Sequence, residues 1–310
     1  MREVRRPERA GSIPVVLVHG ARVPGLASFD LPVPGGSLAE DLAAAAHPVY
    51  VMDARGYGQS TRPAEMSGDP AACPPLVRSS LVVRDLVGVV HAAAERTRAG
   101  AVALLGWATG GMWAGHYTSL YPETVSHLVV DNSLYGGTVG HPMLGPGSDL
   151  EDPEQPGCFH AEAFGGYRLN AADGLLRPWD SSIPKGRVEE WRDPAVAQAY
   201  VEAALASDAT ASSRTPPSFR APTGALEDSF YLACGRQLWD ASLITARCLV
   251  IRSERDFWSR PEDAELLSEH LVHAALVRRV EIPDATHYVH LDRAEAGRAR
   301  FLQEVLDFLG

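Results

Sequence analysis

The sequence of 310 residues predicts an α/β fold, in which a mostly parallel sheet is flanked by helices and a large, mainly helical segment is inserted between two core strands. Short apolar runs alternate with segments of helical periodicity, the pattern of parallel strands joined by helices. The fourth and fifth of the predicted strands are separated by more than a hundred residues, too many for a loop without structure of its own. We therefore assign residues 1–136 and 246–310 to the core and residues 137–245 to a lid. The predicted strands are 15–20, 49–53, 101–105, 126–131, 246–252 and 277–282.

The third of these strands runs into a glycine-rich segment, Leu104 to Gly111, that predicts a tight turn into a helix. In the nucleophile elbow, whose pattern is G-x-S-x-G, such a turn lifts a serine side chain into an active site. Here the lifted residue is Ala108, whose methyl group cannot ionise or form an acyl-enzyme. The glycines that permit the turn are Gly106, Gly110 and Gly111.

An acid and a histidine follow the elbow in the order that a Ser-His-Asp site needs. The strand 246–252 continues into a loop that holds Asp256, and the last strand, 277–282, is followed by His287. The two residues are 31 positions apart, which leaves room for one helix and one strand. We expect His287 to be the base and Asp256 to be its acid.

Two further motifs lie nearer the N-terminus. The first strand ends in His-Gly, so the backbone N–H groups of Ala21 and Thr109 would form the two halves of an oxyanion hole. The second strand continues into Asp53–Ser60, a D-x-R-G-x-G-x-S turn. These motifs and their order resemble the α/β-hydrolase superfamily from about residue 13 to the C-terminus. The resemblance implies a serine hydrolase with a cap domain, acting by acyl transfer without a metal or an organic cofactor.

Other residues near these motifs have alternative interpretations. Asp131 ends its strand and could replace Asp256 as the acid, although Asp256 fits the order of the superfamily better. His290 lies three residues beyond His287 and is expected to pack at the start of the closing helix. Asp53 and Arg55 are expected to hold the turn after their strand and not to contact substrate.

Composition excludes several classes of partner. The net charge is −11 and the pI is near 5.5, which argues against nucleic acid, since that needs a basic face. The segment Met1–Arg6 is basic and lacks the apolar stretch of a signal peptide, and no apolar run reaches membrane-spanning length. We therefore expect a cytoplasmic protein without a membrane partner, and a homodimer stays open. The cysteines are too far apart to predict a zinc site or a disulfide framework: Cys73, Cys158, Cys234 and Cys248.

The inserted segment is expected to cover the carboxyl ends of the core strands and to control access to the elbow. Its first part is rich in glycine and proline, and its second part predicts helices near 188–206 and 225–243. The loop 21–36 carries several prolines and is expected to be stiff and to shape the same entrance. Aromatic residues near these segments favour a bulky apolar ligand. The candidate substrate-binding residues are Arg22, Phe29, Trp107, Tyr135, Trp179 and Trp258.

Two hypotheses explain Ala108. The first, which we favour because the rest of the pattern is intact, is a deliberate Ser-to-Ala replacement that blocks turnover and preserves the pocket. The second is a natural protein that binds a ligand as a receptor, or that uses His287 and Asp256 as a lone general base in a lyase or cofactor-free oxygenase. For an intact site we expect hydrolysis of a carboxylic ester or lactone of a bulky apolar molecule. A thioesterase, a macrocyclase and a carbon–carbon bond hydrolase would use nearly the same residues, whereas haloalkane dehalogenases and related epoxide hydrolases place Asp at the nucleophile.

Overall fold

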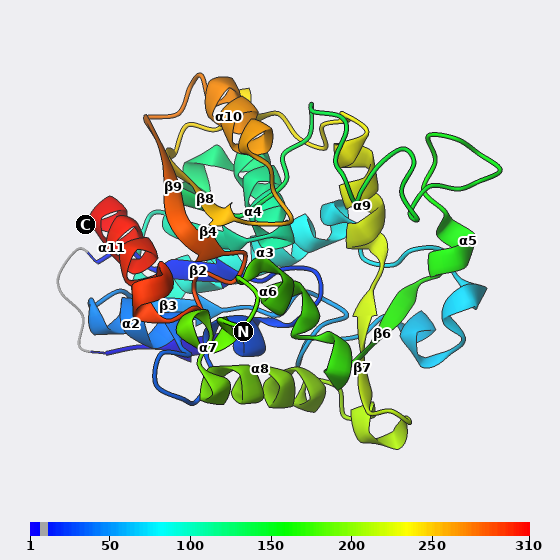
Figure 1. Ribbon diagram of the computed structural model, residues 1–310. Coiled ribbons are helices and arrows are strands. Elements are labelled where there is room, and N and C mark those ends of the chain that lie inside the picture. Colours follow the sequence, from blue (N-terminus) through cyan, green and yellow to red (C-terminus); the bar gives the residue numbers. More distant parts are fainter. Residues whose placement is uncertain (7–11) are drawn as a thin grey trace.

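The computed structural model describes residues 1–6 and 12–310, and its core is a seven-stranded sheet (Figure 1). The strand order is β1-β3-β2-β4-β5-β8-β9, in which β1 is antiparallel to β3 and every other neighbouring pair is parallel. This sheet confirms the predicted α/β class. The strands are β1 Arg2–Val4, β2 Val15–Val18, β3 Val49–Val51, β4 Val102–Trp107, β5 Val125–Asp131, β8 Arg247–Arg255 and β9 Leu276–Thr286.

The central strands are continuous apolar runs because both of their faces are covered by helices. Alternate residues of β2 belong to different cores: Val15 and Leu17 pack on one face of the sheet, and Val16 and Val18 pack on the other. One face is covered by α2 Leu38–Ala44 and α11 Arg298–Leu309. The opposite face is covered by α3 Ser79–Thr97, α4 Thr109–Leu120 and α10 Pro261–His270. The carboxyl ends of the parallel strands are thereby held at one edge of a rigid layer.

The segment between β5 and β8 has its own small sheet, in which β6 and β7 pair in antiparallel fashion. This pairing was not predicted. The part of the segment up to Pro184, which is rich in glycine and proline and shows no sustained periodicity in the sequence, includes β6 and two short helices. The elements of the segment are α5 Ala161–Phe164, β6 Tyr167–Ala171, α6 Arg177–Ser182, α7 Val188–Trp191, α8 Pro194–Ala206, β7 Ser218–Pro222 and α9 Gly224–Ala233.

Both helices that the sequence predicts in the second half of this segment are interrupted. Asp193 caps a new helix, α8, by accepting a hydrogen bond from the N–H of Ala195, and Pro194 cannot continue the helix before it. Helix α9 ends at Ala233, and Gly235 then adopts a positive φ of 82°. The boundaries of the lid stay a prediction, and the N-terminal core range 1–136 includes residues 7–11, which lie outside the described residues.

The loop after β2 also contains an element that was not predicted, helix α1 Gly25–Phe29. A carboxylate oxygen of Asp53 accepts a hydrogen bond from the N–H of Gly25 at 2.8 Å, and the other accepts one from Gln59. Arg55 forms an ion pair with Asp85. In the described parts of the chain, no helix has the length and apolar character that crossing a membrane requires.

Candidate active site

The turn from β4 to α4 holds Ala108 in a strained backbone conformation. Its φ is 52° and its ψ is −124°, a region that costs an L-residue on the order of 1–3 kcal/mol and persists only where neighbours fix it. The fixing contacts include a hydrogen bond of 2.8 Å from the N–H of Ala108 to the carbonyl of Asp131. A Cβ at Gly106 or Gly110 would overlap backbone atoms, so glycine is required at both positions. The turn has the shape of a nucleophile elbow although the side chain that it presents is a methyl group.

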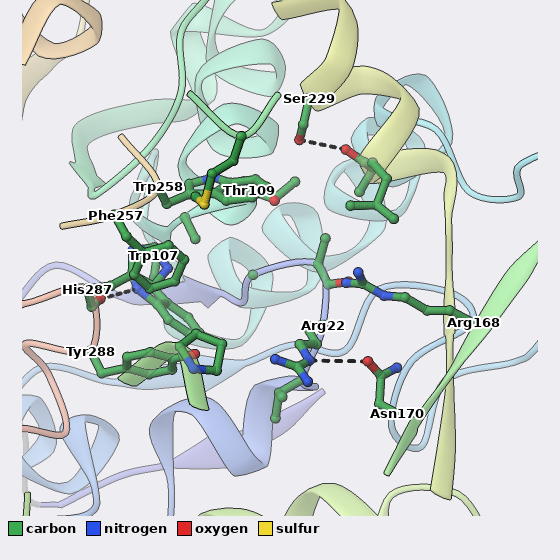
Figure 2. Close-up of a pocket in the computed structure, with 18 of the residues that line it drawn as sticks. Arg22, Trp107, Thr109, Arg168, Asn170, Ser229, Phe257, Trp258, His287 and Tyr288 are labelled. Carbon is green, nitrogen blue, oxygen red and sulfur yellow. Dashed lines mark hydrogen bonds between the residues drawn. The ribbon is translucent and has the colours of Figure 1, made fainter. Parts of the chain in front are cut away.

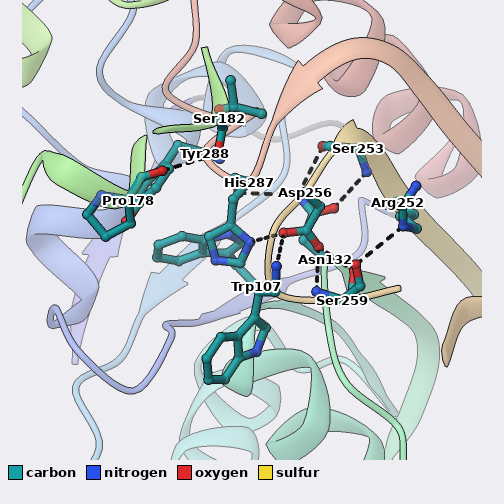
Figure 3. Close-up of polar contacts among 12 residues, drawn as sticks. Trp107, Asn132, Pro178, Ser182, Arg252, Ser253, Asp256, Ser259, His287 and Tyr288 are labelled. Atoms are coloured by element: carbon teal, nitrogen blue, oxygen red, sulfur yellow. Dashed lines mark hydrogen bonds and ion pairs between the residues drawn. The ribbon is translucent and has the colours of Figure 1, made fainter. Parts of the chain in front are cut away.

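His287 and Asp256 lie together at the carboxyl ends of β9 and β8 (Figure 3). The Nδ1 atom of His287 is 2.6 Å from a carboxylate oxygen of Asp256, which is fully buried. The backbone N–H groups of Trp258 and Ser259 each donate to this carboxylate at 2.9 Å, and the hydroxyl of Ser259 donates to it as well. These donors fix the carboxylate, and the carboxylate in turn fixes the orientation of the imidazole.

The backbone also holds the histidine in place. The backbone carbonyl of His287 accepts hydrogen bonds from the indole N–H of Trp107 at 2.8 Å and from the side-chain amide of Asn132 at 3.2 Å. With Nδ1 engaged by Asp256, the Nε2 atom has no partner among the described residues, and His287 and Ala108 line the same pocket. Nε2 is therefore the nitrogen free to exchange a proton with a ligand.

Two backbone N–H groups near the elbow, those of Ala21 and Thr109, belong to residues that the sequence predicts as an oxyanion hole. Neither has a hydrogen-bond acceptor within the described ranges, and both residues line the pocket beside Ala108. The loop that carries Ala21 is held by Tyr57, whose hydroxyl donates to the carbonyl of Ala21 at 3.0 Å. Two free donors next to the elbow match the arrangement that stabilises an oxyanion.

His19 positions this loop, a role that the sequence did not reveal. Its Nε2 accepts a hydrogen bond from the N–H of Ala54 at 3.0 Å, and its Nδ1 lies 2.6 Å from the carbonyl of Gly20. Burial lowers the pKa of His19, which keeps the ring neutral and able to make both contacts. The His-Gly pair after β2 is the feature of the sequence from which this role of His19 could have been predicted.

The pocket between the sheet and the inserted segment has a volume of about 350 Å³ (Figure 2). Three of the predicted substrate-binding residues line it, namely Arg22, Trp107 and Trp258. The inserted segment contributes residues from its first half and from α8 and α9. Residues that line the pocket and were not predicted as site residues are Gly20, Val23, Met143, Arg168, Asn170, Pro178, Tyr200, Ala225, Leu226, Ser229, Phe257 and Tyr288.

Phe29, Tyr135 and Trp179 were predicted to bind substrate, but they lie outside this lining. Phe29 is fully buried and its ring packs 5.4 Å from that of His290. The hydroxyl of Tyr135 is 3.0 Å from Nδ1 of His270, away from the elbow.

The indole N–H of Trp179 donates to a buried carboxylate, so it is not available to a ligand in the pocket. It donates to Asp292 at 2.8 Å, and the ring stacks on Tyr288 at 4.8 Å between centroids. Trp179 thus supports a residue of the pocket wall, and Tyr288 itself lines the pocket. The identity of an aromatic residue does not reveal which of two neighbouring aromatics faces the cavity.

The side chains of the two alternative catalytic residues, Asp131 and His290, form no polar contact with the site among the described residues. Within those residues both carboxylate oxygens of Asp131 are buried without a hydrogen-bond partner, and burial together with the charge of Asp256 raises the pKa of Asp131 well above the usual value. His290 packs against Trp107 at 4.6 Å, and burial, helped by the nearby His287, lowers its pKa to about 3. The geometry therefore pairs His287 with Asp256, and leaves Asp131 and His290 as neutral buried groups.

The described residues contain no group of three or more histidine, cysteine or acidic side chains arranged to hold a metal ion. The site brings together a His-Asp pair, two N–H donors without an acceptor in the described residues and a strained turn that presents residue 108.

Comparisons with known proteins agree with this fold. A family model described as alpha/beta hydrolase fold matches residues 13–294. A search of curated proteins finds no match. Three solved structures illustrate the likeness. A thioesterase domain from the curacin biosynthetic pathway is 16% identical, with 98% of this chain and 93% of that chain covered and a TM-score of 0.60. An enol-lactonase from Burkholderia xenovorans LB400 is 15% identical, with 99% and 95% covered and a TM-score of 0.56.

The third is a meta-cleavage product hydrolase from Pseudomonas fluorescens IP01, in a serine-to-alanine mutant form complexed with acetates. It is 17% identical, with 99% of this chain and 92% of that chain covered and a TM-score of 0.57. Identities this low establish the shared fold, and the family model spans most of the chain. The chain therefore belongs to the α/β-hydrolase fold family.

Proposed function

We propose that this site hydrolyses a carboxylic ester or lactone when serine occupies position 108, and that the present chain, with Ala108, is the non-hydrolysing form of that site. The observation that supports the proposal most strongly is the His287–Asp256 contact of 2.6 Å in a pocket shared with the strained elbow. The elbow keeps a costly backbone conformation although its side chain can do no chemistry. A turn of this shape supports the proposal because it is the one that presents the nucleophile in a nucleophile elbow.

The residues would act in two rounds of proton transfer. In the first, Nε2 of His287 takes the proton of the serine hydroxyl while the oxygen attacks the carbonyl carbon, and the N–H groups of Ala21 and Thr109 bind the developing oxyanion. The imidazolium, stabilised by Asp256, then protonates the leaving alkoxide. In the second, His287 removes a proton from water while the water oxygen attacks the acyl-enzyme, and the imidazolium then returns this proton to the serine oxygen as the bond between that oxygen and the acyl carbon breaks and the acid is released.

The bond that we propose to be cleaved is that of a carboxylic ester or lactone. The solved structures of similar fold include, by their names, an enol-lactonase, a thioesterase domain and a meta-cleavage product hydrolase. We propose an ester or lactone because the pocket combines apolar aromatic walls, formed by Trp107, Phe257 and Trp258, with oxyanion donors. These walls suit an apolar acyl or alkyl chain.

A second candidate is favoured by the free Nε2 of His287 in the chain as it stands. A histidine fixed by a carboxylate can act as a general base without a nucleophile, so a lyase or a cofactor-free oxygenase would need no residue other than Ala108 at the elbow. A ligand receptor would need only the pocket.

The test is a panel of p-nitrophenyl esters of increasing chain length and of five- and six-membered lactones, offered to the unaltered chain and to Ala108→Ser. Hydrolysis by the variant alone supports the hydrolase proposal. Hydrolysis by neither protein, with both folded, contradicts it. Conversion of a bound ligand by the unaltered chain, lost in His287→Ala, would favour the second candidate instead.

A further inference from the structure

The pocket has a polar end opposite His287, formed by three residues that we call the basic pole: Arg22, Arg168 and Asn170 (Figure 2). Arg22 follows β2, whereas Arg168 and Asn170 are two residues apart on β6 and so face the same side of that strand. The Nε atom of Arg22 donates to the amide oxygen of Asn170 at 3.2 Å. Figure 2 shows this contact, with Arg168 beside it and His287 at the other side of the pocket.

The two guanidinium groups of the basic pole lack a counter-ion. Arg22 and Arg168 donate only to uncharged oxygens, and among residues 1–6 and 12–310 no carboxylate forms an ion pair with either. Other arginines at the edge of the inserted segment are paired, as Arg220 is with Asp208 at 2.8 Å. Two cations side by side in a partly desolvated pocket are unfavourable unless an anion joins them.

The basic pole also holds donors that are buried and unused. Nε of Arg168 and the amide nitrogen of Asn170 have no acceptor in the described part of the chain, and Asn170 is only 5% exposed. Burial and the neighbouring charge of Arg22 lower the pKa of Arg168 to about 10, so the group is still charged at neutral pH. Buried donors without acceptors are costly, and a ligand that supplies the acceptors recovers that cost.

We propose that the basic pole binds a carboxylate of the substrate, so that the substrate class is an ester or lactone that carries a free carboxylate away from the scissile bond. This inference rests on the proposed function for the bond that is cleaved. Water adds across that bond to give an acid and an alcohol, and the bound carboxylate is unchanged. The expectation of a purely apolar ligand is thereby narrowed to a ligand with an apolar middle and an anionic end.

A carboxylate fits these donors better than a phosphate does. The planar fork of a guanidinium matches the two oxygens of a carboxylate. Arg168 and Asn170 each have one buried nitrogen without an acceptor among the described residues, which is one nitrogen for each carboxylate oxygen. A phosphate dianion has a third oxygen, which would need a donor outside the basic pole. Among the described residues that line the pocket, the further buried side-chain donor without an acceptor is the indole N–H of Trp258, in the loop of Asp256.

The basic pole is joined to the oxyanion donors through the backbone. Arg22 follows Ala21 directly, and Arg168 donates to the carbonyl of Ala21 at 3.4 Å. An anion held by these arginines would therefore fix the position of the substrate relative to the N–H of Ala21. We expect the arginines to act as positioning residues that govern binding and orientation, and to take no part in proton transfer.

The test measures binding to the unaltered chain by calorimetry, because Ala108 does not consume an ester through an acyl-enzyme. The probes are monoethyl adipate, the neutral diethyl adipate and ethyl 5-phosphonopentanoate. We expect the monoester to bind at least about tenfold more tightly than the diester, since a hydrogen bond to a charged group commonly contributes that much.

Arg22→Gln and Arg168→Gln should each remove most of this preference for the monoester. The matched control is Arg177→Gln, whose side chain is 76% exposed and pairs with Asp173, and which should change the preference less than twofold.

Equal binding of monoester and diester by the unaltered chain would overturn the inference, and so would an unchanged preference in both arginine variants. Tighter binding of the phosphonate than of the monoester would overturn the choice of carboxylate. If Arg168→Gln does not fold, Arg168→Lys, which keeps the charge, and Arg22→Gln decide the matter. Hydrolysis by Ala108→Ser is measured separately. Turnover of neutral esters without an anion preference would support the proposed function and refute carboxylate binding at the basic pole. An anion preference without turnover would support carboxylate binding and contradict the proposed function.

Discussion

Replacing Ala108 by serine should create a large hydrolytic rate, because only the nucleophile is missing. The Nε2 atom of His287 is unpaired among the described residues, its Nδ1 is 2.6 Å from Asp256, and the N–H groups of Ala21 and Thr109 are free there too. Loss of the serine from a complete triad lowers kcat by about a millionfold in a well-studied protease, and we take on the order of 10⁴ as the smallest recovery that this geometry allows. Four decades correspond to about 5.4 kcal/mol of transition-state stabilisation.

The assay is release of p-nitrophenol from the acetate and butyrate esters under steady-state and burst conditions. Residue 108 is 6% exposed, on the wall of the pocket, so the added hydroxyl should change the melting temperature by no more than about 2 °C. The control is the double variant Ala108→Ser with His287→Ala, which should fall back to the rate of the unaltered chain. A folded Ala108→Ser protein that hydrolyses none of the esters, or that hydrolyses them equally well without His287, would refute the reasoning.

Three further results are expected. In the Ala108→Ser background, Asp256→Asn should lower kcat by about 10³–10⁴ through loss of imidazole orientation, whereas Asp131→Asn should leave kcat nearly unchanged; steady-state kinetics of both compares them, and the reverse outcome would move the acid to Asp131. Burial raises the pKa of Asp292 to about 6, so the unfolded chain loses this proton first, and the contribution of Asp292 to the free energy of unfolding should fall by up to about 3 kcal/mol as the pH rises from about 4 to about 6. Urea titrations should show that the unfolding free energy of the unaltered chain decreases relative to that of Asp292→Asn over this range, and a difference that does not change with pH would contradict it. Gly110→Ala should lower the melting temperature by more than about 10 °C, because a Cβ there overlaps a carbonyl oxygen of β2, and a melting temperature within about 2 °C of the unaltered chain would argue against this close approach of the turn to β2.

The sequence predicted the core well because its signals are local. Strands that are buried on both faces must be continuous apolar runs, and the glycines of the elbow are required by contacts within the turn itself. The order of Asp256 and His287 along the chain was enough to predict that they meet, since the carboxyl ends of neighbouring parallel strands lie at one edge of the sheet.

The inserted segment was predicted less well because its structure depends on distant contacts. The pairing of β6 with β7 joins residues about fifty positions apart, and Arg168 and Asn170, which line the pocket, lie on the strand β6. Likewise, Trp179 and Tyr288 are stacked aromatic residues of similar character, and packing alone decides that Tyr288 lines the pocket while Trp179 bonds to Asp292.

The central claim, that position 108 is the place of a missing nucleophile, is tested most directly by covalent labelling with a fluorophosphonate ester, which reacts with an activated serine. We predict that Ala108→Ser gains one label, that mass spectrometry places it on residue 108, and that the unaltered chain and the double variant with His287→Ala gain none. Absence of label from folded Ala108→Ser, or labelling that does not depend on His287, would contradict it.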